Sequence, residues 1–444
     1  MYRFSYILVV VVCFIIIPSS VFAEDKQKYT ESPKKHFKIH LNEIVVSTPM
    51  QKVISSSATP VTVLHGEELR LKAGSTLGET LKQEMGVHGQ SFGPGVGLPV
   101  IRGQSGPRVR VLNDGVGVND ASQVSPDHAS GTVPVLADRI EVLRGPATLL
   151  YGSGAIGGVV NVIDNRIPSE VPDKLIGGAF EQKFNSVSNE SSTALKLEGG
   201  TGHFAFHLDG LYRDNNNIDI SGNAIDASRA QVSEPGLVVT DNTNGFINNS
   251  QSRTKTGTAG ASIVGDRGFF GFSINELENR YGIPPDGSAG SEISVINQEQ
   301  SRYDIKGELK NPVSFLETVR TRLGFTDYQH TEGDEALFQN DTFEGRIEAP
   351  HKPVGNLNGV VGFQAITSKF SAVEIKVNEF LVPITISNNF SFFAQEELAI
   401  GDTTTEFGIR VEHATVNPRG AGNPDKDYTP VSASVSELWD INVD

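Results

Sequence analysis

Two pairs of residues in this sequence combine an imidazole with a carboxylate. Asp127 and His128 are adjacent and follow Pro126, whose fixed backbone favours a bend, whereas His330 and Glu332 are two residues apart. Residues two apart on a strand point to the same face. Imidazole nitrogens and carboxylate oxygens are donors that zinc accepts, usually four of them at about 2.0–2.2 Å. The residues alone leave a second interpretation open, because Asp after Pro also fits a plain turn, and His and Glu also fit a hydrated strand face.

The first pair lies in a segment with the pattern of a small α+β domain, residues 50–170. A helix is expected after Ser75 as its N-cap, with Leu77 and Leu81 on one face. Asn113-Asp114-Gly115 predicts a tight turn. Short β-branched runs predict strands at 61–64, 109–112, 140–143 and 159–163.

The second pair lies in a region of long alternating strands that begins near residue 172. Residues 203–212 place Phe, Leu and Tyr on one face and His and Asp on the other. The alternation gives about twelve strands up to residue 444. Tight turns at 200–202, 265–267 and 401–402 separate long polar loops, which are expected at 214–253, 283–299, 371–388 and 417–428. Alternating short and long connections are typical of an outer-membrane β-barrel, whereas a soluble sandwich gives no reason to sort its loops by side.

Composition narrows the class of protein. The chain has 444 residues and a net charge of 37 − 53 = −16, which argues against nucleic acid as a partner. The single cysteine, Cys13, excludes a disulfide framework and a thiolate metal cluster. Abundant glycine and the lack of a long apolar run exclude a helical membrane protein.

The N-terminal residues predict export. Residues 1–23 combine Arg3, a short apolar run and a small-x-small end at Ala23, which is typical of a secretory signal peptide. Residues 24–49 form a polar leader that contains a β-branched run, residues 43–48. That run could add itself to the edge of a partner's sheet or be the first strand of the next domain, and composition leaves both possibilities open.

Two stretches of the chain resemble a known protein family. Residues 100–115 and 137–163, which include Ile101-Arg102-Gly103 and Leu143-Arg144-Gly145-Pro146, are similar to the plug of TonB-dependent outer-membrane receptors. The resemblance implies an α+β plug domain (50–170) inside a transmembrane antiparallel β-barrel of about 22 strands, of which residues 171–444 would supply the N-terminal part. It also implies that the leader strand is a TonB box, made of Glu43, Ile44, Val45, Val46, Ser47 and Thr48.

Function and partners follow from the same resemblance. It implies a monomeric barrel among the outer-membrane lipids of a Gram-negative bacterium, coupled to TonB of the inner-membrane TonB-ExbB-ExbD complex. No catalytic constellation is recognisable, so no enzyme activity and no permanently bound cofactor are expected. Arg102, Glu141 and Arg144 are expected to form ion pairs within the plug or between plug and barrel, and such pairs would keep the plug shut at rest.

Within the family, the similarity extends to the zinc-uptake receptors. Residues 125–129, 281–284 and 327–332 carry it. The resemblance implies that Asp127 and His128 contribute to a site for zinc as substrate, with His330 and Glu332 as barrel candidates. One departure is that residues 285–290, after the Tyr-Gly-Ile-Pro motif, contain no histidine. A siderophore, haem or another chelate is therefore the alternative substrate.

Length raises further alternatives. About twelve strands are fewer than a plugged transporter barrel requires, and the chain ends without a terminal aromatic residue. The expectation is a receptor cut within its barrel. The remaining alternatives are a surface binding protein without transport and a non-functional fragment.

Overall fold

The structure is a computed structural model that describes residues 60–152, 154–291, 293–420, 422, 424–439 and 441. These residues belong to one compact unit. The expected signal peptide, the leader and the TonB box at Glu43–Thr48 lie outside the described residues. No helix in the described part is long and apolar enough to cross a membrane.

Residues 60–168 form a small α+β domain around a five-stranded sheet with the order β1-β6-β7-β4-β5. Strand β4 pairs with β7 in parallel, and the other neighbours are antiparallel. Ile140, Val142 and Val160 are fully buried in its core with Leu69 and Leu81 of the two helices. Its elements are β1 (Val61–His65), α1 (Gly66–Lys72), α2 (Leu77–Leu81), β2 (Val87–Ser91), β3 (Gly97–Ile101), β4 (Val109–Asn113), β5 (Val116–Gly117), β6 (Arg139–Leu143) and β7 (Gly158–Ile163).

The four strands expected in this domain are present, and the helix start differs by one residue. Thr76 rather than Ser75 is the N-cap of α2, because the Thr76 hydroxyl accepts the Glu79 N–H at 3.2 Å. The Glu79 carboxylate in turn accepts the Ser75 N–H at 3.1 Å, so the two side chains close the helix start reciprocally. The turn at Asp114-Gly115 forms with both residues at positive φ, 48° and 85°.

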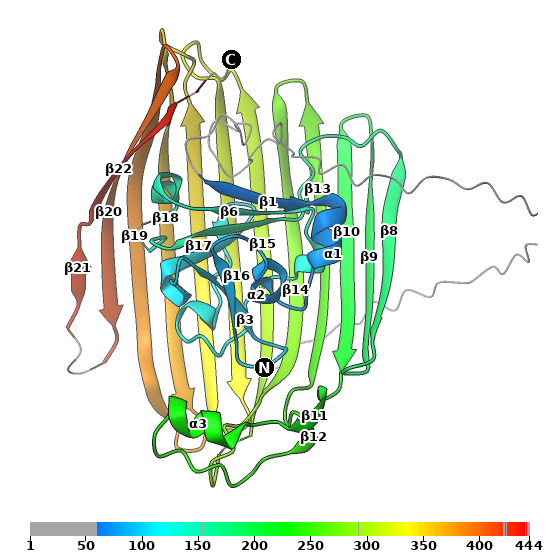
Figure 1. The fold of residues 1–444 in the computed structure, drawn as a ribbon. Helices are drawn as coiled ribbons and strands as arrows, with labels where there is room; N and C mark the ends of the chain where they lie inside the picture. The colour runs from blue at the N-terminus through cyan, green and yellow to red at the C-terminus, as the bar shows by residue number, and fades with distance from the viewer. Residues whose placement is uncertain are drawn as a thin grey trace, which may run out of the picture. The chain divides into compact units, whose positions relative to one another are not determined.

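The second part is a thirteen-stranded antiparallel sheet, in which nearly every strand pairs with its sequence neighbours. Figure 1 shows the elements of the small domain set against this sheet, within the same compact unit. Among the described residues β8 is one edge, and β21 and β22 form the other. The strands are β8 (Ile176–Asn185), β9 (Glu190–Thr201), β10 (Phe204–Asn215), β13 (Ser252–Gly265), β14 (Gly268–Ile283), β15 (Ser294–Lys310), β16 (Thr318–Glu332), β17 (Ala336–Pro350), β18 (Leu357–Glu374), β19 (Glu379–Ile400), β20 (Thr403–Pro418), β21 (Lys426–Tyr428) and β22 (Val431–Trp439).

The two faces of this sheet differ as the alternation predicts. In β10, Phe204, Leu208 and Tyr212 are 44–48% exposed on one face, whereas Ala205 and His207 are fully buried on the other. The buried face contacts the small domain, because Arg110 of β4 pairs with Glu344 of β17 at 2.9 Å. An apolar outer face around a polar inner face is the pattern of a membrane barrel.

The long connections gather at one end of the sheet. Residues 216–251 join β10 to β13 and contain the β11–β12 hairpin (Asp219–Asn223 and Asn244–Phe246) and α3 (Ala227–Ser233), while 284–293 join β14 to β15. The expected loop at 371–388 was wrong, since β18 continues to Glu374 and β19 begins at Glu379. Residues 373–378 do alternate apolar and polar side chains, which is compatible with a strand, and the pairing is interrupted only by register shifts near Ala372.

Candidate functional site

A loop of the small domain carries the first His–carboxylate pair. Asp120 closes this loop, because one of its carboxylate oxygens accepts the Ser122 N–H at 3.0 Å and the other accepts the Gly131 N–H at 2.6 Å. The Ala129 N–H donates to the hydroxyl of Tyr281 on β14 at 2.9 Å. These bonds fix the backbone on either side of His128 and attach it to the long sheet.

Strand β16 carries the second pair at the end of the sheet that bears the long connections. The His330 ring stacks on Phe338 of β17, with centroids 4.4 Å apart and planes 10° apart. The Tyr328 hydroxyl and His330 Nδ1 are hydrogen-bonded at 2.9 Å. This bond directs Nε2 away from Tyr328, and Nε2 has no hydrogen-bond partner among the described residues.

The structure brings all four predicted metal residues together. His128 Nε2 lies 3.0 Å from Glu332 Oε1, and His128 Nδ1 lies 3.1 Å from Asp127 Oδ1. His330 Nε2 lies 3.7 Å from the same Glu332 oxygen. One donor atom each from His128, His330 and Glu332 falls within a group whose members are no more than 4.8 Å apart. Their role as metal ligands stays a prediction.

Burial and charge set the protonation of the plug-side histidine. Burial disfavours a charged His128, but the carboxylates of Asp127 and Glu332 outweigh that penalty and raise the pKa of His128 to about 9. The same contact with His128 holds the pKa of Asp127 well below its usual range, against the opposing effect of burial. His128 is therefore an imidazolium at neutral pH, and a bound cation would have to displace its proton.

The arrangement is suited to a small transition-metal ion. Two donors on a tetrahedral zinc lie roughly 3.3–3.6 Å apart, from bond lengths of about 2.0–2.2 Å. The two His–Glu332 distances, 3.0 and 3.7 Å, bracket that range. Small side-chain adjustments would suffice for these three residues to bind one ion, with Asp127 beside them.

Comparisons with known proteins identify the fold. Residues 53–159 match the family described as the TonB-dependent receptor plug domain. The chain superposes on the copper transporter OprC with a TM-score of 0.68 at 15% identity, covering 86% of this chain and 60% of that one. It superposes on the FrpB iron transporter of Neisseria meningitidis with a TM-score of 0.70 at 13% identity, covering 87% and 63%. The chain has the plug-and-barrel fold of TonB-dependent receptors.

Curated relatives are similar over a shorter stretch. A vitamin B12 transporter BtuB of Photobacterium profundum is 31% identical over 213 residues, which is 45% of this chain and 33% of that protein. Another of the same name, from Vibrio vulnificus, is 35% identical over 178 residues, covering 36% and 28%. The chain thus spans about a third of the length of these relatives. They are named as transporters and not as enzymes, and none of these names denotes a zinc receptor.

For Arg102 and Arg144 the described residues give no ion pair, and their expected pairs stay a prediction. Arg102 is exposed in a turn after β3 with φ 51°, and Arg144 donates to the Thr62 hydroxyl. Glu141 pairs with Arg139 at 3.3 Å, within the plug sheet.

The plug is attached to the barrel wall by other charged residues. Arg110 donates to both carboxylate oxygens of Glu344 at 3.0 and 2.9 Å, and Glu344 also accepts the Gly117 N–H at 3.0 Å. Arg346 and Arg410 both donate to the Leu150 carbonyl, at 2.7 and 3.0 Å. These inward arginines could have been suspected from their alternation with outward apolar residues.

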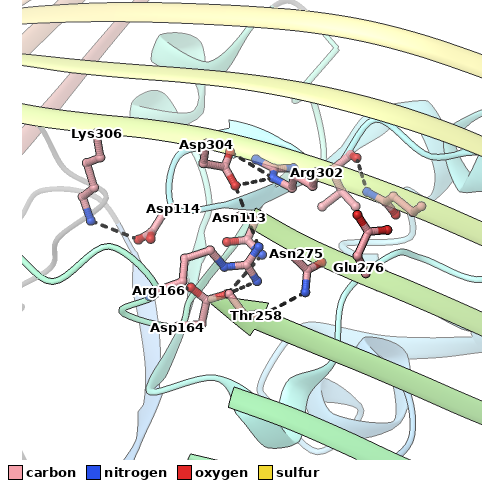
Figure 2. A network of polar contacts seen from close by, with 12 residues as sticks. Asn113, Asp114, Asp164, Arg166, Thr258, Asn275, Glu276, Arg302, Asp304 and Lys306 are labelled. Carbon is pink, nitrogen blue, oxygen red and sulfur yellow. Dashed lines mark hydrogen bonds and ion pairs between the residues drawn. The ribbon is translucent and has the colours of Figure 1, made fainter. Parts of the chain in front are cut away.

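A buried polar network joins the end of the plug to strand β15 (Figure 2). Asp164 pairs with Arg166, and Arg166 reaches Asp304 of the barrel at 3.8 Å. Arg302 pairs with Asp304 at 2.8 Å and donates to the Gly117 carbonyl at 2.8 Å. Burial raises the pKa of Asp164, but the opposing effect of Arg166 is larger. The net pKa lies below its usual value, so this carboxyl stays ionised. The labelled members are Asn113, Asp114, Asp164, Arg166, Thr258, Asn275, Glu276, Arg302, Asp304 and Lys306.

Proposed function

We propose that this chain belongs to an outer-membrane receptor that imports a divalent transition-metal ion, with zinc as the first candidate, using energy supplied by TonB. The observation that carries the proposal is the convergence of His128 from the plug with His330 and Glu332 from the barrel. Two imidazoles and a carboxylate form a donor set that suits zinc. Because the donors come from both parts, one bound ion would connect plug and barrel.

The burial of the four side chains favours a small ligand at this site. The side chains of His128 and His330 are 4% and 0% exposed, whereas Glu332 and Asp127 are 30% and 39% exposed. The two carboxylates therefore form the accessible side of the site and the imidazoles its base. A dehydrated ion fits between such groups, while a large chelate could touch only the carboxylates.

Import requires that binding be transmitted to the plug. A cation between His128 and Glu332 would replace their direct contact and change how the plug loop is held. Binding must favour a state in which the Glu43–Thr48 segment is available on the periplasmic side, because a ligand shifts an equilibrium only through its differential affinity. TonB then pairs with that segment by adding a strand, and pulls.

A metal chelate is the second candidate, and two observations favour it. The relatives that match by sequence are named vitamin B12 transporters. The outer loop at residues 285–290 offers Asp286 but no histidine that could capture a free ion. In this alternative the carboxylates of Asp127 and Glu332 contact the chelate from below.

Growth and uptake separate the two candidates. A strain that lacks the receptor is complemented with the parent gene, with His330→Ala, or with His351→Ala as a matched control. His351 pairs with Glu396 at 3.0 Å at the opposite end of the barrel. The zinc proposal predicts that only His330→Ala fails to restore growth on limiting zinc. The proposal would be overturned if all three strains grew equally on limiting zinc and the His330→Ala strain grew poorly on a limiting iron chelate or on limiting vitamin B12.

A further inference from the structure

Gln298 is a buried side chain whose polar atoms have no partner. It lies on β15 and is 1% exposed, and both its amide oxygen and its amide nitrogen lack hydrogen bonds among the described residues. Buried amides in native proteins are nearly always hydrogen-bonded, and leaving one unpaired is costly. An amide in this state is explained either by an ordered water or by a ligand that binds there.

The register places Gln298 next to the candidate metal site. Gln298 is the direct cross-strand partner of His330, and both side chains are buried on the inner face. Directly paired residues have Cβ atoms about 4.5–5.5 Å apart. His330 Nε2 likewise has no hydrogen-bond partner in the described part of the chain, and neither has Gln300 Oε1, two residues from Gln298 on β15.

Two polar neighbours of Gln298 have partners of their own. Asn279, its cross-strand partner on β14, accepts the Thr254 hydroxyl at 3.0 Å. The Tyr328 hydroxyl bonds to His330 Nδ1 at 2.9 Å. Ile296, the preceding inward residue, is apolar and buried. The polar atoms on this face that remain without a partner among the described residues include His330 Nε2, on the site side, and Gln300 Oε1, two residues along β15.

We propose that Gln298 is a further ligand-contacting residue of this site, whose amide oxygen completes the donor set of the bound ion. The inference rests on the proposed function and specifies the site further. Two neutral imidazoles, a neutral amide and the carboxylates of Glu332 and Asp127 would balance a divalent cation without excess charge. Such an N/O set suits zinc and similar borderline ions better than Cu(I), which prefers sulfur.

Zinc affinity of the purified receptor in detergent, measured by competition with a chromophoric chelator, tests the proposal. Gln298→Met keeps the length of the side chain and removes its donors, so affinity should fall ~10–100-fold. Gln298→Glu keeps an oxygen donor and should retain most of the affinity. Gln300→Met is the matched control, because Gln300 lies two residues along the same face and also has an unpaired amide oxygen, while its amide nitrogen donates to the Val118 carbonyl at 3.3 Å. This control should keep zinc affinity unchanged.

Stability of the metal-free receptor distinguishes ligand contact from a structural role. Because the amide is unpaired without ligand, Gln298→Met should leave the thermal midpoint unchanged or raise it. Unchanged zinc affinity in Gln298→Met, or a lower midpoint of its metal-free form, would show that the amide is satisfied by an ordered water or by the protein, and would overturn the proposal. If the parent receptor binds no zinc, the proposed function itself fails and this inference with it. If the parent binds zinc as tightly as Gln298→Met, only this inference fails.

Discussion

His128 Nε2 and Glu332 Oε1 lie 3.0 Å apart, although 204 residues separate them in the chain. One belongs to a plug loop and the other to the end of barrel strand β16. The contact is charge-assisted, because His128 is protonated at neutral pH. This contact therefore holds the plug loop against the barrel. A cation that binds Glu332 would have to compete with the protonated His128 for its carboxylate.

Glu332→Gln tests that competition. The amide keeps the shape of the side chain but removes the charge that attracts a cation, so zinc affinity should fall by at least ~10–100-fold, the range for weakening a metal's supporting shell. Glu396→Gln, which alters the His351 pair at the opposite end, serves as the control. Isothermal titration of both variants checks the prediction. If the Glu332→Gln and Glu396→Gln variants bound zinc equally well, Glu332 would line the site without binding the metal.

Tyr281→Phe tests how the plug loop is positioned. The Tyr281 hydroxyl accepts the Ala129 N–H, and its removal leaves a buried donor unpaired, which costs about 1–3 kcal/mol. We expect a lower thermal midpoint and a several-fold loss of zinc affinity, because His128 precedes Ala129. Both should be measured on the same preparation. Full zinc affinity despite lower stability would show that the carboxylates alone hold His128 in place.

Part of this architecture could be predicted from the sequence. Alternation located most barrel strands, since period-two patterns report directly on which face is buried, and short β-branched runs located the four plug strands. The β18–β19 hairpin at 371–388 was predicted as a loop although residues 373–378 alternate apolar and polar side chains, and register shifts near Ala372 interrupt its pairing. Helix capping was predicted to within one residue, at Ser75 instead of Thr76, because both side chains can cap.

The site was harder to predict. Spacing placed His330 and Glu332 on one face, but only the pairing of β15 with β16 reveals that Gln298 lies opposite His330. The ion pairs expected for Arg102 and Arg144 likewise stay a prediction. Contacts between residues far apart in the chain depend on register and on how the plug meets the wall, and neither is encoded in a local motif.

Asp164→Asn tests the network that secures the end of the plug. Replacing one partner leaves Arg166 buried with less compensation, which costs ~3–5 kcal/mol for a buried pair. Hydrogen exchange of the amides in residues 158–168 should accelerate in the variant. A double variant, Asp164→Asn with Arg166→Met, should recover part of the protection, because it removes the uncompensated charge. No change in exchange in the single variant would contradict the prediction.

Protonation of the Asp164 carboxyl should also make the stability of the plug depend on pH. Because Arg166 lowers the pKa of folded Asp164, its contribution to stability is present above the ordinary aspartate pKa of about 3.9 and is lost as pH falls through the lower folded value. Protection of residues 158–168 should therefore decline below about pH 4 in the parent. The decline should be shallower in Asp164→Asn, which has no carboxyl to protonate.

Deleting Glu43–Thr48 distinguishes a transporter from a surface binding protein. None of the four predicted metal residues belongs to this segment, so zinc affinity of the purified deletion variant should equal that of the parent. Uptake of labelled zinc by cells should fall to the level of a strain without the receptor, because TonB would have no strand to pair with and pull. A deletion of equal length at 30–35, upstream in the leader, controls for shortening of the chain. Uptake that survives loss of Glu43–Thr48 would show that this segment does not couple the receptor to its energy source, and binding without uptake in the parent would identify a surface binding protein.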